Sequence, residues 1–183
     1  MKYLIIPGYK NSGPEHWQTL WQKQYPLQFT RVEQYNWSAP VKEDWIGRIN
    51  EYVEKLSEPA IIVAHSLGCI AVAHWAIHHQ SDNIVGALLV APADVNNTSN
   101  RLLQNFAPVP LNKFPFKSIV VASTNDPHVS TYHAAIFAAN WGSRFVCIGE
   151  KGHINAASEL NDWKEGLTLL NSLKQTQEFV YQT

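Results

Sequence analysis

The chain has 183 residues, 45% of them hydrophobic, and a formal net charge of −1, which fits one globular domain spanning residues 1–183. The balanced charge argues against nucleic acid and strongly charged partners, and no apolar run is long enough for a membrane helix or a signal-peptide core. The two cysteines, Cys69 and Cys147, lie in apolar contexts. We expect buried free thiols and a cytoplasmic location, and we disfavour a disulfide.

Strand-like and helix-like runs alternate along the chain, which favours a three-layer α/β fold. The expected strands cover residues 2–7, 28–34, 60–64, 84–91, 117–123 and 144–148. The expected helices cover residues 14–25, 41–57, 67–80, 129–140 and 156–174. Residues 93–116, rich in Asn and Pro, interrupt the alternation and have room for one short helix around 99–106. We therefore expect a compact, mostly parallel sheet of about six strands with helices on both faces and no large lid.

A serine stands at the junction between the expected strand 60–64 and the expected helix 67–80. Ser66 lies in the run Ala-His-Ser-Leu-Gly, with a small residue two places before it and another two places after it. This pattern is typical of a nucleophile elbow, a sharp turn that lifts a serine hydroxyl above a sheet. Ser66 is therefore the candidate nucleophile of a serine hydrolase.

A serine hydroxyl needs a base, usually histidine, and a group that orients the base. On an elbow scaffold the order along the chain is serine, acid, histidine. His153, in a glycine-containing loop after the last expected strand, is the best candidate base. Asp126 follows the strand 117–123 and is the best candidate acid. Asp94, which follows the strand 84–91, is the alternative acid, and a turn-forming role before a proline is the competing interpretation of Asp126.

Five other histidines are weaker candidates for a role in the site. We expect His65, beside the serine, to serve packing, and His128, near Asp126, is a candidate for lining the mouth of the site. His133 borders a helix start. His74 and His78 are four residues apart on one helix, but they lack a third ligand at helical spacing, so a metal site is not expected.

Seven tryptophans is a high number for this length. We expect Trp17, Trp21, Trp45 and Trp75, all in helices, to be core anchors. Trp37 follows the second strand, where it could wall a pocket, although core packing is the preferred interpretation.

The chemistry also needs backbone N–H groups that bind the developing oxyanion. One candidate is the N–H of Leu67, the residue after the serine, at the start of a helix whose dipole favours negative charge. The other is the N–H of Tyr9, in the loop that follows the first strand, where Gly8 enables the turn. The alternative is that residues 7–13 form a plain connection, although seven residues with two glycines exceed what a simple turn needs.

The assembled motifs resemble the small α/β-hydrolases of the retinoblastoma-binding-protein-nine and YdeN type. The resemblance rests on segments 8–17, 64–68, 125–127 and 152–155, which occur in the family's order and spacing. It implies an α/β-hydrolase fold with a shortened sheet and little or no lid. By position it also implies a triad of Ser66, Asp126 and His153, and it accommodates alanine at position 64.

We therefore expect a serine hydrolase that cleaves an ester or amide bond of a small-molecule or peptide substrate through an acyl-enzyme, with no metal or organic cofactor. A non-catalytic interaction module on the same scaffold is the first alternative. A flavodoxin-like nucleotide binder is the second, although the loop after the first strand lacks a phosphate-binding glycine pattern.

Overall fold

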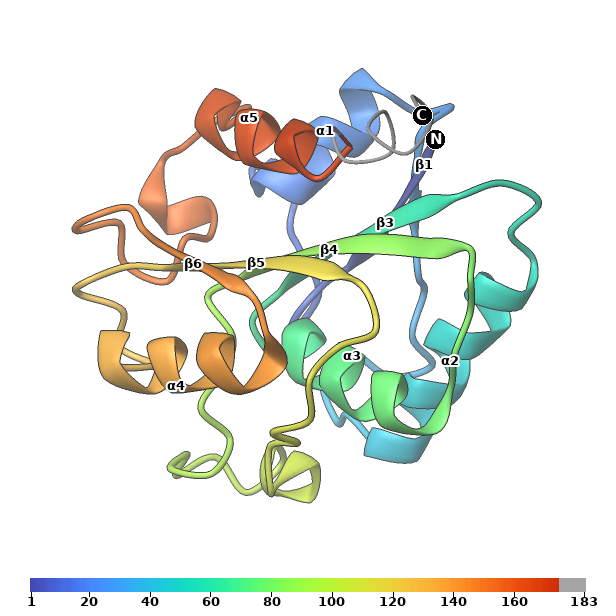
Figure 1. The fold of residues 1–183 in the computed structure, drawn as a ribbon. Coiled ribbons are helices and arrows are strands. Elements are labelled where there is room, and N and C mark those ends of the chain that lie inside the picture. Colours follow the sequence, from blue (N-terminus) through green and yellow to red (C-terminus); the bar gives the residue numbers. More distant parts are fainter. Residues whose placement is uncertain (175–183) are drawn as a thin grey trace, which may run out of the picture.

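The computed structural model describes residues 1–174 as a twisted sheet between two layers of helices (Figure 1). All six described strands run parallel, in the order β2-β1-β3-β4-β5-β6. The strands are β1 (Lys2–Ile6), β2 (Phe29–Arg31), β3 (Ala60–His65), β4 (Ile84–Val90), β5 (Lys117–Ala122) and β6 (Arg144–Cys147). The expected six-stranded, mostly parallel sheet is confirmed.

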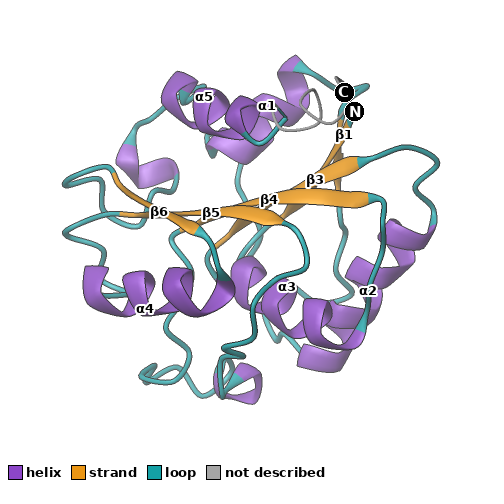
Figure 2. Ribbon diagram, viewed as in Figure 1, coloured by secondary structure: helices purple, strands orange, loops and turns teal. Residues whose placement is uncertain are grey.

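Within residues 1–174, four α-helices connect these strands, a fifth follows β6, and together they cover both faces of the sheet (Figure 2). They are α1 (Trp17–Gln24), α2 (Lys42–Glu54), α3 (Leu67–His78), α4 (Thr131–Trp141) and α5 (Lys164–Ser172). Helices α1 and α5 lie on one face, and α2, α3 and α4 lie on the other. Two short 3₁₀ helices occupy Gln104–Phe106 and Ala156–Ser158.

The central strand β3 shows why the sheet is covered on both faces. All six of its residues are buried, which is typical of a strand in a parallel sheet. Because side chains alternate along a strand, Ile62 joins the core beneath α2, α3 and α4, whereas Ile61 and Val63 join the core beneath α1 and α5. The predicted tryptophan anchors are also confirmed, because Trp17, Trp21, Trp45 and Trp75 are all buried.

The parallel sheet places the carboxyl ends of all six strands at one edge of the molecule. The chain passes from β1 outward to β2 and then returns to β3 on the other side of β1. This change of direction is a topological switch point, where open α/β sheets place their ligand sites. The loops that follow β1, β3, β4, β5 and β6 therefore converge there.

All five helices differ from their predicted bounds, and for the first and the last the structure shows the physical reason. Helix α1 begins at Trp17 and not at residue 14, because the Nδ1 of His16 accepts the amide N–H of Gln18 and caps the helix there. The expected helix 156–174 is divided into the 3₁₀ turn Ala156–Ser158 and α5. Between them Glu159, Asn161 and Trp163 adopt positive φ, which an α-helix does not allow.

Two further predictions need correction. The short helix expected around residues 99–106 is a single 3₁₀ turn, Gln104–Phe106, after a non-helical stretch. The prediction that both thiols are buried is wrong for Cys147. Cys69 is fully buried in α3, but Cys147 is exposed, because β6 is an edge strand with little cover.

Candidate active site

Ser66 occupies a strained turn between β3 and α3. Its φ is 53° and its ψ is −121°, a left-handed conformation that costs a non-glycine residue about 1–3 kcal/mol. The turn is held from two sides, since the Ser66 N–H donates to the Val90 carbonyl at 2.9 Å and its own carbonyl accepts the Cys69 N–H at 3.0 Å. The strand and the helix thus fix the direction of the hydroxyl.

Two glycines allow the neighbouring backbone to approach this turn. A Cβ on Gly68 would lie 2.3 Å from the Ile6 carbonyl oxygen, so only glycine lets α3 pack against the end of β1. A Cβ on Gly8 would lie 2.8 Å from the Cβ of Ser66. The loop after β1 therefore lies directly against the serine.

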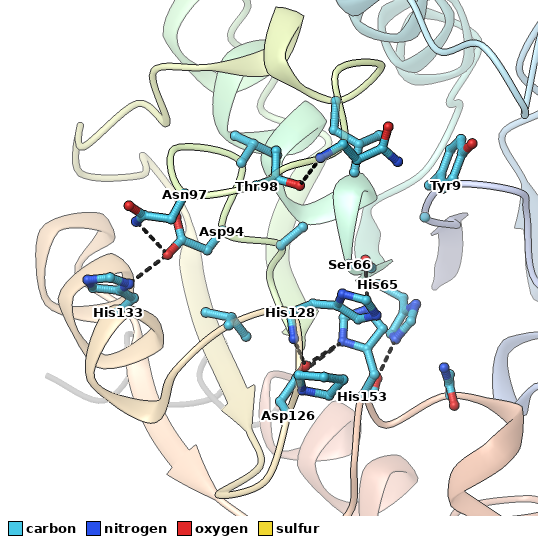
Figure 3. Close-up of a pocket in the computed structure, with 18 of the residues that line it drawn as sticks. Tyr9, His65, Ser66, Asp94, Asn97, Thr98, Asp126, His128, His133 and His153 are labelled. Carbon is cyan, nitrogen blue, oxygen red and sulfur yellow. Dashed lines mark hydrogen bonds and ion pairs between the residues drawn. The ribbon is translucent and has the colours of Figure 1, made fainter.

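The structure brings Ser66, His153 and Asp126 together from three separate loops (Figure 3). The Nε2 of His153 lies 2.8 Å from the Ser66 Oγ. The Nδ1 of His153 lies 3.0 and 2.9 Å from the two carboxylate oxygens of Asp126. An ionised carboxylate only accepts hydrogen bonds, so Nδ1 carries the proton and Nε2 is free to accept the serine O–H.

The acid is buried, and a second donor holds it in place. The Asp126 side chain is fully buried and that of His153 is 10% exposed. The amide N–H of His128 donates to Asp126 Oδ1 at 2.8 Å. This bond forms the local turn that is expected of an aspartate before a proline. Asp126 therefore forms the turn and also contacts the candidate base.

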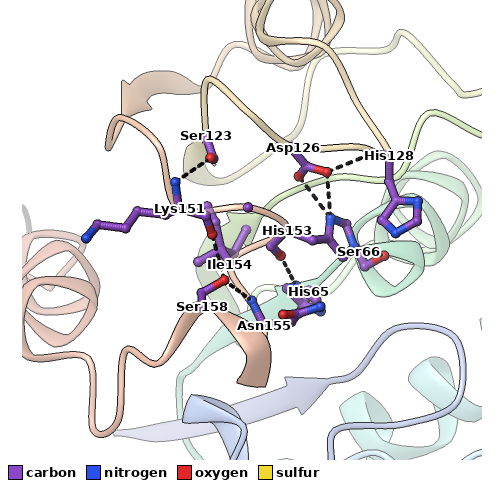
Figure 4. A network of polar contacts seen from close by, with 12 residues as sticks. His65, Ser66, Ser123, Asp126, His128, Lys151, His153, Ile154, Asn155 and Ser158 are labelled. Carbon is purple, nitrogen blue, oxygen red and sulfur yellow. Dashed lines mark hydrogen bonds and ion pairs between the residues drawn. The ribbon is translucent and has the colours of Figure 1, made fainter.

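A polar network joins the loop that carries the acid to the loop that carries the histidine (Figure 4). The Oδ1 of Asn125 accepts the Gly152 N–H at 2.7 Å, and the Ser123 Oγ accepts the Lys151 N–H at 2.9 Å. The Thr124 N–H donates to the Gly149 carbonyl at 2.9 Å. These bonds fix the separation between Asp126 and His153.

His65 does more than fill space, contrary to the expectation of a packing role. Its Nε2 donates to the backbone carbonyl of His153 at 2.9 Å. The next carbonyl, that of Ile154, accepts the indole N–H of Trp17 at 2.8 Å. The histidine loop is therefore anchored both to the strand that carries the nucleophile and to α1. No sequence signal marked either bond, because each joins residues far apart in the chain.

Burial favours the neutral form of the two buried imidazoles near His153, those of His16 and His65. Desolvation, with smaller contributions from Arg31 and His153, lowers the pKa of His16 from 6.5 to about 3. Desolvation also lowers the pKa of His65 well below its usual value and, to a lesser extent, the pKa of His128. The three rings form a continuous series with His153, with ring centroids 4.5–4.9 Å apart.

The alternative acid, Asp94, belongs to a different pair. Its Oδ2 lies 2.6 Å from the Nδ1 of His133 and accepts the side-chain N–H of Asn97 at 2.8 Å. It makes no hydrogen bond to His153 within residues 1–174. Asp126 is therefore the carboxylate that contacts the candidate base, and Asp94 contacts a histidine that the sequence had not singled out.

The two candidate oxyanion donors come from two different segments next to the serine. The Leu67 N–H is at the first position of α3, and Tyr9 follows the glycine that packs on Ser66. Within the described chain, neither amide donates to a backbone or side-chain acceptor. Both N–H groups are therefore available for a ligand, and their role stays a prediction.

These side chains surround one pocket of about 800 Å³. Its lining comes from the loop after β1, the nucleophile turn, residues 93–103, residues 126–133 and the His153 loop. No lysine or arginine is among the lining residues. His128 lines this pocket, as expected, whereas Trp37 packs edge-on against Trp45 beside the core and does not line it.

The remaining histidine pair shows no metal-binding arrangement. His74 is buried and its Nε2 donates to the Phe106 carbonyl at 2.7 Å, so this nitrogen is protonated. Within residues 1–174, no three His, Cys, Asp or Glu side chains are grouped as metal ligands. None of the helices in this part of the chain has the length and apolar content that crossing a membrane requires.

Two solved structures are similar to this chain along nearly its whole length. A YdeN-like hydrolase from Pectobacterium atrosepticum superposes with a TM-score of 0.85 and 29% identity, covering 95% of this chain and 90% of the other. The ydeN gene product of Bacillus subtilis superposes with a TM-score of 0.79 and 24% identity, covering 96% and 100%. In sequence, YdeN of Bacillus subtilis (strain 168) is 30% identical over 89 residues, which span about half of each chain (47% of both).

The family model for serine hydrolases matches residues 3–172, which is nearly the whole chain. The fold is the compact α/β-hydrolase fold expected from the motifs, and it is shared with the solved α/β hydrolase domain-containing protein 10 from mouse, which superposes with a TM-score of 0.72 and 14% identity, covering 95% of this chain and 90% of the other. The chain is an enzyme that belongs to the serine hydrolase family, among YdeN-like hydrolases.

Proposed function

We propose that this hydrolase cleaves an ester or amide bond through an acyl-enzyme on Ser66, with His153 as the general base and Asp126 as the orienting acid. The observation that carries the proposal is the continuous hydrogen-bonded series from Asp126 through His153 to Ser66. It has the order of roles that nucleophilic catalysis by serine requires.

In the first half of the reaction, His153 Nε2 takes the proton from the Ser66 Oγ as the oxygen attacks the carbonyl carbon. A tetrahedral intermediate forms, and the carbonyl oxygen becomes an oxyanion. The imidazolium then gives its proton to the leaving alcohol or amine as the bond to the carbonyl carbon breaks. Asp126 keeps the Nδ1 proton in place and stabilises the imidazolium, which raises the fraction of His153 in the useful tautomer.

The oxyanion is bound by the amide N–H groups of Leu67 and Tyr9. Leu67 adds the positive end of the α3 dipole, and Gly8 lets the Tyr9 amide approach the serine. In the second half of the reaction, His153 takes a proton from water, and the resulting hydroxide attacks the acyl-enzyme. The second tetrahedral intermediate then collapses: the bond from the acyl carbon to the Ser66 Oγ breaks, the imidazolium returns its proton to that oxygen, and the free acid leaves.

Labelling with a fluorophosphonate probe tests this proposal, because the probe reacts with activated serines. Wild-type protein should be labelled stoichiometrically, and Ser66→Ala should abolish labelling. The exposed Ser38 lies outside the pocket, so Ser38→Ala is the matched control and should be labelled like the wild type. Wild-type protein that resists the probe would instead favour a non-catalytic interaction module on the hydrolase scaffold.

A further inference from the structure

A second carboxylate–imidazole pair lines the same pocket outside the Ser66 series (Figure 3). Asp94 and His133 lie 2.6 Å apart, and their side chains are 7% and 38% exposed. No serine or other nucleophile bonds to this imidazole within residues 1–174. The proposed reaction leaves both residues without a role.

The backbone holds Asp94 in a fixed relation to the nucleophile. The preceding Ala93 N–H donates to the Ser66 carbonyl at 3.3 Å, and the Asp94 N–H donates to the His128 carbonyl at 3.3 Å. The segment that carries Asp94 is thus bonded to the nucleophile turn on one side and to the Asp126 loop on the other. A ligand bound to Asp94 would therefore be placed relative to Ser66.

One oxygen of the Asp94 carboxylate is left for a ligand. Oδ2 accepts both the Asn97 amide and the His133 imidazole, whereas Oδ1 accepts no hydrogen bond from the described residues. This oxygen is not among the fully buried polar atoms that lack a partner, so a donor in the pocket can reach it. The pocket is the open space next to Asp94, so a donor group on the substrate is the natural partner.

The surrounding lining determines what kind of donor fits. On this side the lining includes neutral side chains that both donate and accept hydrogen bonds, namely Asn97, Thr98, Ser99, Asn100 and Ser130, beside the apolar Ala93, Val95, Leu103 and Val129. A hydroxyl group can donate to Asp94 Oδ1 and at the same time accept a bond from a neighbouring side chain, which an ammonium group cannot do. Because no lysine or arginine lines the pocket, a carboxylate or phosphate finds no counter-charge.

We propose that Asp94 and His133 form a substrate subsite that binds a hydroxyl group, with Asp94 Oδ1 accepting the hydroxyl proton and His133 holding the carboxylate in position. The substrate class is then an ester or amide with a hydroxylated acyl or alcohol part, in preference to one with plain alkyl chains. This inference rests on the proposed function, since it concerns substrates of the Ser66 centre.

Matched ester pairs test the subsite. One series contains 4-nitrophenyl esters of ω-hydroxy acids with three to six carbons. Each is paired with the 4-nitrophenyl ester of the acid of the same length that lacks the hydroxyl group. The other contains acetate esters of glycerol and glucose, each paired with an alkyl acetate of similar size. The measured quantity is the ratio of kcat/KM for the hydroxylated ester to kcat/KM for its partner. We expect a ratio of about ten or more in at least one series for the wild type.

Asp94→Asn should lower this ratio about tenfold, since a bond to a charged acceptor becomes a bond to a neutral one. His133→Gln should lower it less, and because His133 is partly exposed this variant serves if Asp94→Asn does not fold. The matched control is Asp82→Asn, an exposed aspartate in the loop before β4 at the opposite edge of the sheet, and it should leave the ratio unchanged.

Binding to Ser66→Ala protein gives a readout that needs no turnover. By calorimetry, the favoured hydroxylated ester should bind about tenfold tighter than its partner, and adding Asp94→Asn should remove the difference. Equal affinities, or a wild-type ratio near one in both series, would overturn the subsite even if fluorophosphonate labels Ser66. Resistance to the probe with the binding preference intact would overturn the proposed reaction and leave the subsite standing.

Discussion

The pocket contains two aspartate–histidine pairs that differ in what lies beyond the imidazole. In the first pair, Asp126 is fully buried and the far nitrogen of His153 meets the Ser66 hydroxyl at 2.8 Å. In the second pair, His133 is 38% exposed and no hydroxyl is bonded to its imidazole within residues 1–174. In both pairs a carboxylate contacts the Nδ1 of an imidazole, yet among the described residues only the imidazole of the first pair also contacts a serine hydroxyl.

This contrast shows that a short bond between a carboxylate and an imidazole does not make a catalytic centre by itself. The first pair is held from several sides, by the His65 side chain, by the Asn125 amide and by the Trp17 indole next along the loop. The second pair lies at the start of α4 and in the loop after β4, where the Asn97 amide donates to Asp94 and the Ser130 Oγ accepts the backbone N–H of His133. Fixed geometry next to a hydroxyl is what separates the two.

The largest expected effect comes from removing the nucleophile or its base. Ser66→Ala or His153→Ala should lower kcat on a 4-nitrophenyl ester by about a million-fold if the triad acts as a unit. His133→Ala should cost no more than about tenfold on the same ester. Steady-state kinetics with active-site titration measures kcat for each variant. Comparable losses in kcat for the two histidine variants would contradict the assignment of different roles to the two pairs.

Exchanging each carboxylate for an amide gives the next largest contrast. Asp126→Asn should lower kcat by about ten-thousand-fold, because an amide in place of the carboxylate favours the wrong imidazole tautomer. The loss in kcat for Asp94→Asn should be at least about a hundred times smaller. Circular dichroism confirms that both variants fold before rates are compared. A larger loss in kcat for Asp94→Asn than for Asp126→Asn would instead assign the orienting role to Asp94.

Loosening the His153 loop should have an intermediate effect. His65→Ala removes the donor to the His153 carbonyl, and a displacement of about 1 Å at a catalytic group can cost up to about a hundred-fold. We expect kcat to fall about 10- to 100-fold with KM nearly unchanged, and His65→Gln to recover part of the loss through its amide N–H. The exposed His78, changed to alanine, is the control. Equal losses in the alanine and glutamine variants would indicate a packing role.

The smallest effect is a difference in stability between pH 7 and pH 5. Unfolded His16 takes up a proton near pH 6.5, whereas desolvation holds its pKa at about 3 in the folded protein, so acid favours the unfolded state between these values. Between pH 7 and pH 5, the free energy of unfolding of the wild type should fall by about 2 kcal/mol more than that of His16→Asn. The asparagine keeps a helix-capping acceptor. Urea unfolding at both pH values measures the difference. If the wild type and His16→Asn lose the same stability between pH 7 and pH 5, His16 is not kept neutral by burial.

The parts of the site that depend on local sequence could be predicted. The Ser66 turn follows from a buried strand, two small residues and an apolar helix, all within twenty residues. Asp126 and His153 could be found because parallel strands bring their carboxyl ends to one edge of the sheet. The chain order of the elbow then chose between Asp126 and Asp94.

The parts that depend on contacts between distant segments could not be predicted. The bond between Asp94 and His133 joins residues 39 positions apart and requires the course of the loop after β4. The division of the last expected helix depends on positive φ at Glu159, Asn161 and Trp163, which the pattern of apolar residues does not encode. The role of His65 became visible only once the His153 carbonyl was placed beside it.

The connection from β4 to β5 has a consequence for how this enzyme can change. Residues 91–116 supply Asp94 and much of one pocket wall, but they supply neither the reacting hydroxyl nor its base nor the orienting acid. In the proposed reaction, the Asp94 subsite and the groups that cleave the bond thus come from separate stretches of the sequence. Grafting a different connection between the same two strands would offer a route to new selectivity without rebuilding the reaction centre.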